Sequence, residues 1–231
     1  MENYLKENYV IFCDFDGTIT KEDAINKLFE TFAEKSWLAI EKSWQDGLIG
    51  SKECLEKQLN CIKNISENGL NAFIDQIKID ESFIDFINFV CRNKIDFYIV
   101  SDGFDLIISK VLNNYGIKNI KIYSNRLEHK NNKLIPYFDF HCADCNTKAG
   151  LCKCNVIKEN HNSKKIIYIG DGLSDICAAK FADILFAKNK LMEYAELIDM
   201  NHTPFSVFGE ILSILQKKKE IHNNLIEHCN R

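Results

Sequence analysis

The sequence carries paired carboxylates in two segments, each directly after a short apolar run. Asp14 and Asp16 follow the run YVIFC in the segment DFDGT, and Asp171 and Asp175 follow the run KIIYI in the segment GDGLSD. Two carboxylates held close together repel each other unless a cation or a proton lies between them. Oxygen ligands alone select a hard cation such as Mg²⁺. A single acidic pair would also fit a solvated turn, so the prediction of a metal site depends on whether the two segments meet.

A third polar segment, Ser101-Asp102-Gly103, follows the apolar run FYIV and supplies a hydroxyl donor and a flexible backbone. In open α/β sheets, ligands bind beyond the carboxyl ends of the strands. Right-handed crossovers bring the ends of parallel strands to one edge of the sheet. Three polar strand ends therefore predict one common site at that edge.

The elements that must hold these residues alternate between strand and helix. Short β-rich runs are separated by apolar residues at helical spacing, which predicts a parallel sheet covered by helices on both faces. Residues 125–139 are typical of a hairpin with Asn131-Asn132 at its turn. Thr203 and Pro204 predict the start of a last helix, which carries Phe205 to Leu215. The predicted strands are 9–13, 97–100, 120–123, 165–169 and 184–187.

The alternation breaks between the first two strands, where about 80 residues contain no convincing strand. Four apolar stripes at helical spacing lie there instead, and they are most simply read as helix faces packed in a core. We expect a helical cap over residues 21–80, inserted into an α/β core made of residues 1–20 and 81–231. The stripes begin at Ile25, Trp37, Leu55 and Leu70.

The composition is that of a compact globular protein, with 231 residues, 46% hydrophobic residues and only 10 Gly and 2 Pro. The net charge of −4 argues against a general nucleic-acid coat or an anionic membrane surface as partner. The sequence has no apolar run of membrane-spanning length, and its first ten residues lack the pattern of a signal peptide. We therefore expect a cytoplasmic protein with reduced thiols. The oligomeric state is not indicated.

The order DFDGT, SDG, a lysine and GDGLSD resembles the four motifs of the haloacid dehalogenase-like hydrolases, over about residues 9–190. The helical insertion resembles the small cap of the phosphoserine-phosphatase-like subgroup. The resemblance implies a Rossmann-like, three-layer α/β fold with a parallel sheet core and an inserted α-helical cap domain. It also implies an enzyme that hydrolyses phosphoric monoesters with Mg²⁺ as cofactor.

The resemblance implies a role for each motif residue. Asp14 would attack phosphorus and form an aspartyl-phosphate, and Asp16 would protonate the leaving group and then activate water. The Asp14 carboxylate, the backbone carbonyl of Asp16 and Asp171 would bind Mg²⁺. Asp175 would bind the metal through water or orient the catalytic lysine. The presence of an acid at Asp16 favours phosphoester hydrolysis over the dehalogenase and ATP-driven pump reactions of the superfamily.

Ser101, with the backbone amide of Asp102 or Gly103, would bind the phosphoryl group. Two lysines could neutralise its charge. Lys153 is the preferred one, because Cys152-Lys153 followed by Ile157 resembles the lysine-bearing helix start of the family, and Lys148 is the alternative.

Four cysteines surround these lysines: Cys142, Cys145, Cys152 and Cys154. Their spacing allows a structural Zn²⁺ site, a reduced cysteine-rich loop or a redox pair. A similar cysteine pattern occurs in phosphoethanolamine/phosphocholine phosphatases, and a shorter one ending in CKC occurs in the methionine-salvage phosphatases.

The substrate class follows from the cap and from the resemblance. The predicted cap contains no arginine to hold the carboxylate of phosphoserine, which disfavours that substrate. Asp23 stands where phosphoserine phosphatases place an acid near the substrate amine, although a helix-start carboxylate would also explain it. The resemblance extends furthest with the methionine-salvage phosphatases and includes Trp44, Gln58 and Lys188.

We expect a small phosphorylated metabolite as partner, with 2-hydroxy-3-keto-5-methylthiopentenyl 1-phosphate as the leading substrate. Phosphocholine or phosphoethanolamine comes second, and phosphoserine third. A phosphotransferase and a non-catalytic metal-binding module are the rival functions.

Overall fold

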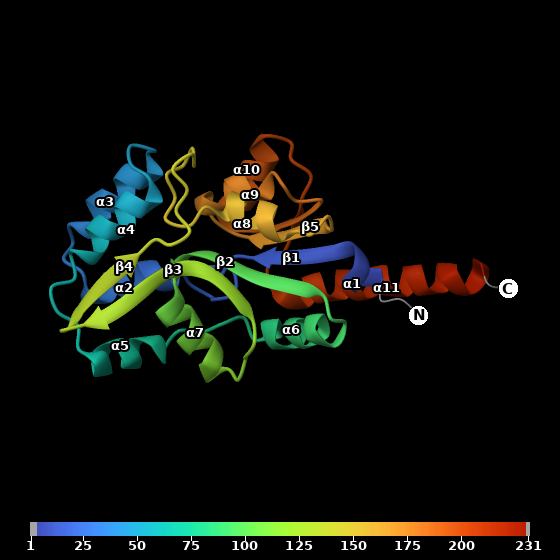
Figure 1. Cartoon of the computed structure of the whole chain (residues 1–231), viewed down its shortest axis with the longest axis horizontal. Coiled ribbons are helices and arrows are strands. Elements are labelled where there is room, and N and C mark those ends of the chain that lie inside the picture. The colour runs from blue at the N-terminus through green and yellow to red at the C-terminus, as the bar shows by residue number, and fades with distance from the viewer. Residues whose placement is uncertain (1–3, 230–231) are drawn as a thin grey trace.

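The computed structural model describes residues 4–229, which form a seven-stranded sheet in the order β4-β3-β2-β1-β5-β6-β7 (Figure 1). All neighbouring strands are parallel except β3 and β4, which form an antiparallel hairpin. The five predicted strands are confirmed, and β2 and β3 extend beyond their predicted ends. The strands are β1 (Tyr9–Cys13), β2 (Asp96–Phe104), β3 (Lys121–Lys130), β4 (Lys133–Tyr137), β5 (Lys165–Gly170), β6 (Ile184–Ala187) and β7 (Thr203–Pro204).

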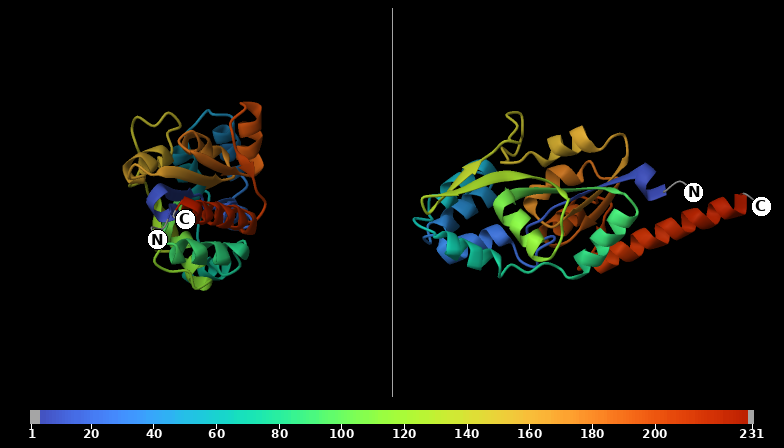
Figure 2. Two further views of the ribbon diagram at one scale, coloured as in Figure 1. Left: turned by 90° about the vertical axis from the view of Figure 1, so that its right-hand side faces the viewer. Right: turned by 60° about the horizontal axis from the view of Figure 1, so that its bottom comes forward.

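Helices cover both faces of the sheet, which confirms the predicted three-layer α/β architecture (Figures 1 and 2). Successive side chains of β1 point to opposite faces: Ile11 and Cys13 join one core cluster, and Val10 and Phe12 join the other. All four side chains are fully buried, as expected for a central parallel strand. One face carries α6 (Ser82–Arg92), α7 (Asp105–Asn114) and α11 (Phe208–Cys229); the other carries α8 (Lys153–Asn160), α9 (Ile176–Ala179) and α10 (Asn189–Leu197), and α1 (Tyr4–Asn8) precedes β1.

Four helices lie between β1 and α6 and gather at one end of the molecule, beside the β3–β4 hairpin (Figure 1). We call residues 21–80 the helical insert. Its helices coincide with the four apolar stripes predicted from the sequence. An antiparallel bridge between Thr20 and Ile79 brings the two ends of the insert together. The division into a core and a cap domain stays a prediction. The helices are α2 (Ala24–Phe32), α3 (Trp37–Gln45), α4 (Ser51–Leu59) and α5 (Glu67–Ile74).

The predicted hairpin turn is confirmed, whereas the predicted start of the last helix is wrong. Asn131 and Asn132 both have positive φ, 51° and 58°, as a two-residue hairpin turn of type I′ requires. Thr203 and Pro204 form the edge strand β7, where a missing N–H is tolerated. Helix α11 starts at Phe208 instead, and the Glu210 carboxylate accepts the N–H of Ser206 at 2.7 Å.

The position of β1 determines where a ligand can bind. β1 pairs with β2 on one side and with β5 on the other. Strands β2 to β4 therefore lie on one side of β1, and strands β5 to β7 lie on the other. Such a reversal of strand order opens a crevice beyond the carboxyl ends of the strands. Asp14 and Asp171 directly follow β1 and β5, whereas Ser101 lies within β2, just after Val100, where the continuous pairing with β3 is interrupted. No helix in the described part of the chain is long and apolar enough to cross a membrane.

Candidate active site

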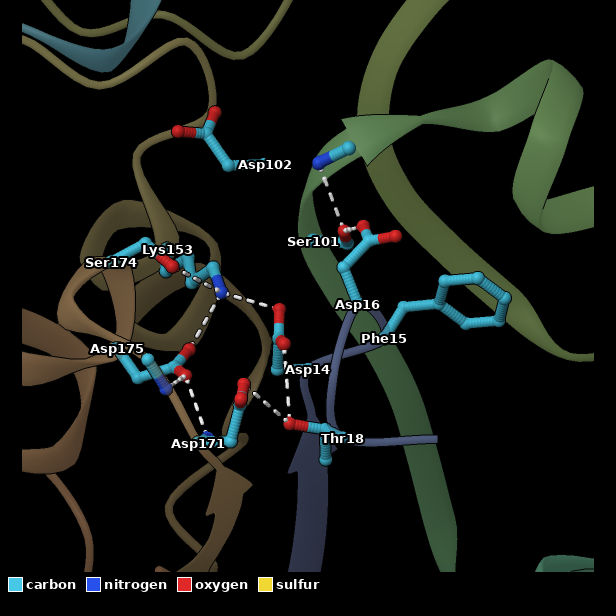
Figure 3. A network of polar contacts seen from close by, with 12 residues as sticks. Asp14, Phe15, Asp16, Thr18, Ser101, Asp102, Lys153, Asp171, Ser174 and Asp175 are labelled. Atoms are coloured by element: carbon cyan, nitrogen blue, oxygen red, sulfur yellow. Dashed lines mark hydrogen bonds and ion pairs between the residues drawn. The ribbon is translucent and has the colours of Figure 1, made fainter. Parts of the chain in front are cut away.

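Three aspartates from the two acidic segments meet at the carboxyl ends of β1 and β5 (Figure 3). Asp14, Asp171 and Asp175 each offer a carboxylate oxygen, and these oxygen atoms all lie within 4.8 Å of one another. The backbone N–H of Asp14 donates to the carbonyl of Ile169 at 2.9 Å, which holds the two strand ends together. The two acidic segments therefore do meet, and the described residues bring together carboxylate oxygens that could hold one cation.

Lys153 begins α8 and points into this group (Figure 3). Its Nζ lies 2.6 Å from Asp14 Oδ1 and 2.6 Å from Asp175 Oδ1, and its side chain is only 3% exposed. Burial lowers the pKa of Lys153, but the charges of Asp14 and Asp175 raise it more, so the net shift is upward and Lys153 stays protonated. Lys148, the alternative lysine, is exposed in the loop before α8, with its backbone against Gly50.

Asp175 has no free carboxylate oxygen. Its Oδ1 accepts hydrogen bonds from Lys153 and from the Tyr168 hydroxyl at 2.6 Å each. Its Oδ2 accepts the backbone N–H groups of Asp171 and Gly172 at 3.0 and 2.9 Å. Asp175 is completely buried, so these contacts fix its position. The geometry suits the orientation of Lys153 better than direct contact with a metal.

Thr18 joins Asp14 and Asp171, a role that the sequence reasoning missed. Its hydroxyl lies 3.2 Å from Asp14 Oδ2 and 3.1 Å from Asp171 Oδ1. One hydroxyl proton serves only one of these oxygens at a time. Gly17, with φ of +74°, allows the close approach, since a Cβ there would lie 2.5 Å from Asp171 Oδ2. The position of Thr18 within DFDGT was the available signal.

The oxygen donors of Asp14 and Asp171 fit a hard divalent cation. Burial, followed by repulsion from Asp175, raises the pKa of Asp14 well above its usual range and raises the pKa of Asp171 to about 6. A cation between the two carboxylates would lower both pKa values again. The site therefore has both the ligands and the excess of negative charge that a Mg²⁺ site needs.

Asp16 faces the same cavity but lies in a different environment. Burial, followed by the charge of Asp23, raises its pKa to about 8, so its carboxyl group is mostly protonated at neutral pH. Ser101 Oγ donates to Asp16 Oδ2 at 3.0 Å, and the N–H of Gly103 donates to Ser101 Oγ at 2.9 Å. Asp16 Oδ1 is buried and has no partner among the described residues. Asp16 is thus placed to give a proton to a bound molecule.

The side chain of Asp102 lies apart from the Asp14–Lys153 group (Figure 3). Its Oδ1 accepts Asn125 Nδ2 at 3.0 Å and the N–H of Leu151 at 2.8 Å, while its Oδ2 accepts the hydroxyl of Ser51. These contacts tie the helical insert, β3 and the cysteine-containing loop to the strand end that carries Ser101. The side chain of Asp102 therefore has a structural role in connecting these elements, and only its backbone remains a candidate for ligand contact. The sequence reasoning missed Ser51 and Asn125.

A cavity of about 320 Å³ opens between this edge of the sheet and the helical insert. The core lines it with Asp14, Asp16, Ser101, Asp102, Gly103, Asp171, Gly172, Leu173, Ser174, Asn189 and Lys190, and the insert contributes residues that include Asp23, Glu41, Trp44 and Gln58.

The structure shows Asp23 at a helix start, and its role toward a substrate stays a prediction. Its Oδ1 caps α2 by accepting the N–H groups of Ile25 and Asn26 at 2.9 and 2.8 Å. The same side chain also lines the cavity.

The four cysteines of the predicted zinc site do not come together. Cys152 shares a hydrogen bond with Cys145, whereas Cys154 shares one with Cys177 on α9. Cys152 is the N-cap of α8, and two residues along a helix correspond to about 200° of rotation. Cys154 therefore faces away from the loop, and the described residues do not support the predicted zinc site.

Comparisons with known proteins agree with this geometry. The model of the Putative Phosphatase family matches residues 9–213. The 2-hydroxy-3-keto-5-methylthiopentenyl-1-phosphate phosphatase of Lysinibacillus sphaericus is 33% identical over 91% of this chain and 95% of its own. The enzyme of the same name from Bacillus velezensis is 30% identical over 92% of both chains.

Among solved structures, a phospho-aspartyl intermediate analogue of phosphoserine phosphatase superposes with a TM-score of 0.70, at 22% identity over 90% of this chain and 99% of that one. A phosphoserine phosphatase from T. onnurineus superposes with a TM-score of 0.68, at 13% identity over 93% and 96% of the two chains. These likenesses confirm the fold. The sequence matches show the family: the chain belongs to the Putative Phosphatase family and is a phosphoric monoester hydrolase with the haloacid dehalogenase-like fold.

Proposed function

We propose that this protein is a Mg²⁺-dependent phosphatase that hydrolyses a small phosphorylated metabolite through an aspartyl-phosphate on Asp14. The observation that carries the proposal is that two carboxyl groups in one cavity have different partners: Asp14 contacts Lys153, and Asp16 contacts Ser101. Asp14 lies against the protonated Lys153, whereas burial and the charge of Asp23 keep Asp16 protonated at neutral pH. A nucleophile and a proton donor are thus available together.

The chemistry follows from these two carboxyl groups. Lys153 holds Asp14 Oδ1 and thereby directs the other oxygen toward a bound phosphoryl group. As the Asp14 oxygen bonds to phosphorus, the leaving alkoxide takes the proton of Asp16. The resulting Asp16 carboxylate then takes a proton from water, which attacks phosphorus and releases phosphate and free Asp14. The ammonium group of Lys153 offsets the negative charge that remains on the phosphoryl oxygens.

We assign the metal ligands to Asp14, Asp171 and the backbone carbonyl of Asp16. Bound Mg²⁺ would neutralise charge on the phosphoryl group and orient it for attack. Asp175 holds Lys153 through a hydrogen bond, and Thr18 aligns the Asp14 and Asp171 carboxylates.

Ser101, together with the backbone amide of Asp102 or Gly103, would bind the phosphoryl oxygens. The helical insert would act as the cap that excludes water and selects the leaving group.

The leading substrate is 2-hydroxy-3-keto-5-methylthiopentenyl 1-phosphate. Its support is that relatives of this name are about 30% identical over most of the chain. Phosphoethanolamine or phosphocholine is the second candidate, and it is favoured by the acidic side chains of Asp23 and Glu41 on the cavity wall. A location in the cytoplasm stays a prediction.

Phosphate release from a panel of phosphorylated metabolites tests the proposal. We expect Mg²⁺-dependent turnover that EDTA abolishes, with the methylthio ketose phosphate giving the highest kcat/KM. Asp14→Asn should be folded and inactive. In the wild-type enzyme, beryllium fluoride should bind to the Asp14 carboxylate as a mimic of the aspartyl-phosphate. Turnover by Asp14→Asn would contradict the nucleophile assignment. Glycerol phosphate formed in the presence of glycerol would indicate phosphotransfer, and absence of any turnover would favour a non-catalytic module.

A further inference from the structure

The wall that the helical insert contributes to the cavity is acidic. Asp23 and Glu41 are its two charged residues, and among the described residues that line the cavity, those of the insert include no Lys or Arg. Apolar and aromatic groups from Ile25, Trp44 and Leu55 lie on the same wall. The insert therefore offers a leaving group hydrogen-bond acceptors and apolar surface but no cation. Lys190, which also lines the cavity, belongs to α10 of the core.

Glu41 is held in a defined position on this wall. Gln45 Nε2 donates to its Oε1 at 2.9 Å, and Gln58 Nε2 donates to its Oε2 at 3.0 Å. Gln58 is only 1% exposed, so it anchors the carboxylate from inside the insert. Cys54 Sγ lies 4.0 Å from the same Oε2 and makes a weak third contact. Oε1 accepts only the Gln45 amide among the described residues and has further acceptor capacity. No cation is paired with Glu41 among the described residues.

Asp23 differs from Glu41 in this respect. Its Oδ1 already accepts the backbone N–H groups of Ile25 and Asn26, and its Oδ2 accepts the side chain of Asn26 at 3.0 Å. The carboxylate of Asp23 is thus engaged in starting α2. The charge of Glu41 nonetheless reaches Asp23, since it contributes, after burial, to raising the Asp23 pKa. The negative charge of Glu41 therefore affects other groups that line the cavity.

We propose that Glu41 is a specificity-determining residue, which accepts a hydrogen bond from an O–H or N–H group of the leaving group and repels a carboxylate at that position. The inference rests on the proposed phosphatase function and deepens it. The substrate class is a phosphomonoester whose leaving group carries an O–H or N–H donor and no negative charge. A hydroxy ketone phosphate and an aminoalkyl phosphate share this chemistry.

A matched pair of substrates isolates the effect. Glycerol 3-phosphate and 3-phosphoglycerate differ chiefly in a terminal hydroxymethyl group against a carboxylate. We expect the wild-type enzyme to prefer glycerol 3-phosphate in kcat/KM by at least tenfold. Glu41→Gln should reduce this ratio by about tenfold, which corresponds to roughly 1.4 kcal/mol, mainly through KM, because it removes the repulsion between two negative charges. Glu41→Lys should reverse the preference.

The ratio is measured on one preparation of each variant, so a partial loss of folded protein cancels. Glu56→Gln is the matched control, because Glu56 is exposed on the outer face of α4 and lies outside the cavity. It should leave the ratio at the wild-type value. Phosphoethanolamine distinguishes the two donors. If an ammonium group is the natural partner, Glu41→Gln should lower kcat/KM for phosphoethanolamine more than it lowers kcat/KM for glycerol 3-phosphate.

An unchanged ratio in both Glu41 variants would overturn the inference. This outcome differs from failure of the proposed function, which would show as a wild-type enzyme without Mg²⁺-dependent turnover of p-nitrophenyl phosphate. An active wild-type enzyme that prefers 3-phosphoglycerate would also overturn the role of Glu41, while the phosphatase function would stand.

Discussion

The ammonium group of Lys153 lies 2.6 Å from Asp14 Oδ1, and the two side chains are 3% and 6% exposed. A buried ion pair recovers the cost of removing its charges from water only when its geometry is good and its remaining polar atoms are satisfied. Asp175 provides the second contact of Lys153, also at 2.6 Å. One cation is therefore shared by two carboxylates, and the group keeps a net negative charge until another cation binds.

Replacing Lys153 should damage both activity and stability. In Lys153→Met, Asp14 and Asp175 lose their cation, and breaking a buried pair costs about 3–5 kcal/mol of unfolding free energy. Without the ammonium group of Lys153, the negative charge on the phosphoryl oxygens is no longer offset, which should lower kcat by roughly 10²–10³-fold. Urea unfolding and p-nitrophenyl phosphate turnover measure the two effects.

Lys148→Ala is the control for Lys153→Met, because Lys148 is exposed on the neighbouring loop. It should change kcat less than twofold. If Lys148→Ala were inactive and Lys153→Met active, the assignment of the catalytic lysine would be wrong.

Asp16→Asn should separate substrates by their leaving groups. An alkyl phosphate needs the proton of Asp16, so its kcat should fall by about 10²–10⁴-fold. p-Nitrophenolate leaves without protonation, so phosphorylation of Asp14 should continue with p-nitrophenyl phosphate. The second step still lacks its base, and rapid mixing should show a burst of one p-nitrophenolate per active site. Equal losses with both substrates and no burst would contradict the role of Asp16 as acid and base.

The stability of the metal-free protein should depend on pH in a direction opposite to that of ordinary ion-paired carboxylates. The pKa values of Asp16 and Asp171 are raised in the folded state to about 8 and about 6 from 3.8. Between the unfolded and folded values, the native state binds more protons than the unfolded state, so stability decreases as the pH rises. We expect urea midpoints in EDTA to fall from about pH 5 to about pH 8.

Saturating Mg²⁺ should reverse much of that loss, since its binding favours the ionised carboxylates and stabilises the native state. Asp171→Asn tests the connection: it should raise the stability of the metal-free protein at the higher pH and remove most of the stabilisation by Mg²⁺. A wild-type midpoint that rises with pH in EDTA would show that these carboxyl groups are not destabilised by burial.

Much of this architecture was predictable because it depends on local patterns. Fully apolar runs such as Tyr9–Cys13 and Ile184–Ala187 gave strand positions to the residue, since both faces of a central parallel strand are buried. Three polar strand ends implied one site, because parallel strands end at one edge. Thr203-Pro204 misled because the same dipeptide suits a helix start and an edge strand, and only the neighbouring β6 decides between them.

The parts of the site that could not be predicted depend on distant contacts. Ser51 and Asn125 are ordinary polar residues in the sequence, yet the fold brings both to Asp102. The four cysteines illustrate the opposite case, in which close spacing suggested a cluster. The start of α8 after Cys152 turns Cys154 toward Cys177, and only the three-dimensional direction of each side chain reveals this.

The contact between Ser51 and Asp102 predicts how the helical insert is fixed over the cavity. Ser51 Oγ donates to the Asp102 carboxylate and accepts the N–H of Gly150 at 3.2 Å. Ser51→Ala leaves a buried donor and an acceptor without their partner, which should cost about 1–3 kcal/mol of unfolding free energy. Because the insert would then be less firmly held, KM for an alkyl phosphate should rise several-fold with a smaller change in kcat.

Ser43→Ala is the matched control in the insert, since the Ser43 hydroxyl only donates to Ala39 of its own helix at 2.9 Å. It should leave KM unchanged. Asp102→Asn keeps one acceptor oxygen but replaces the other with a donor, so it should resemble Ser51→Ala in KM, and the double variant should be no worse than Asp102→Asn alone. Additive increases in KM would mean that Ser51 and Asp102 act separately, because two residues that act through one shared contact can lose that contact only once.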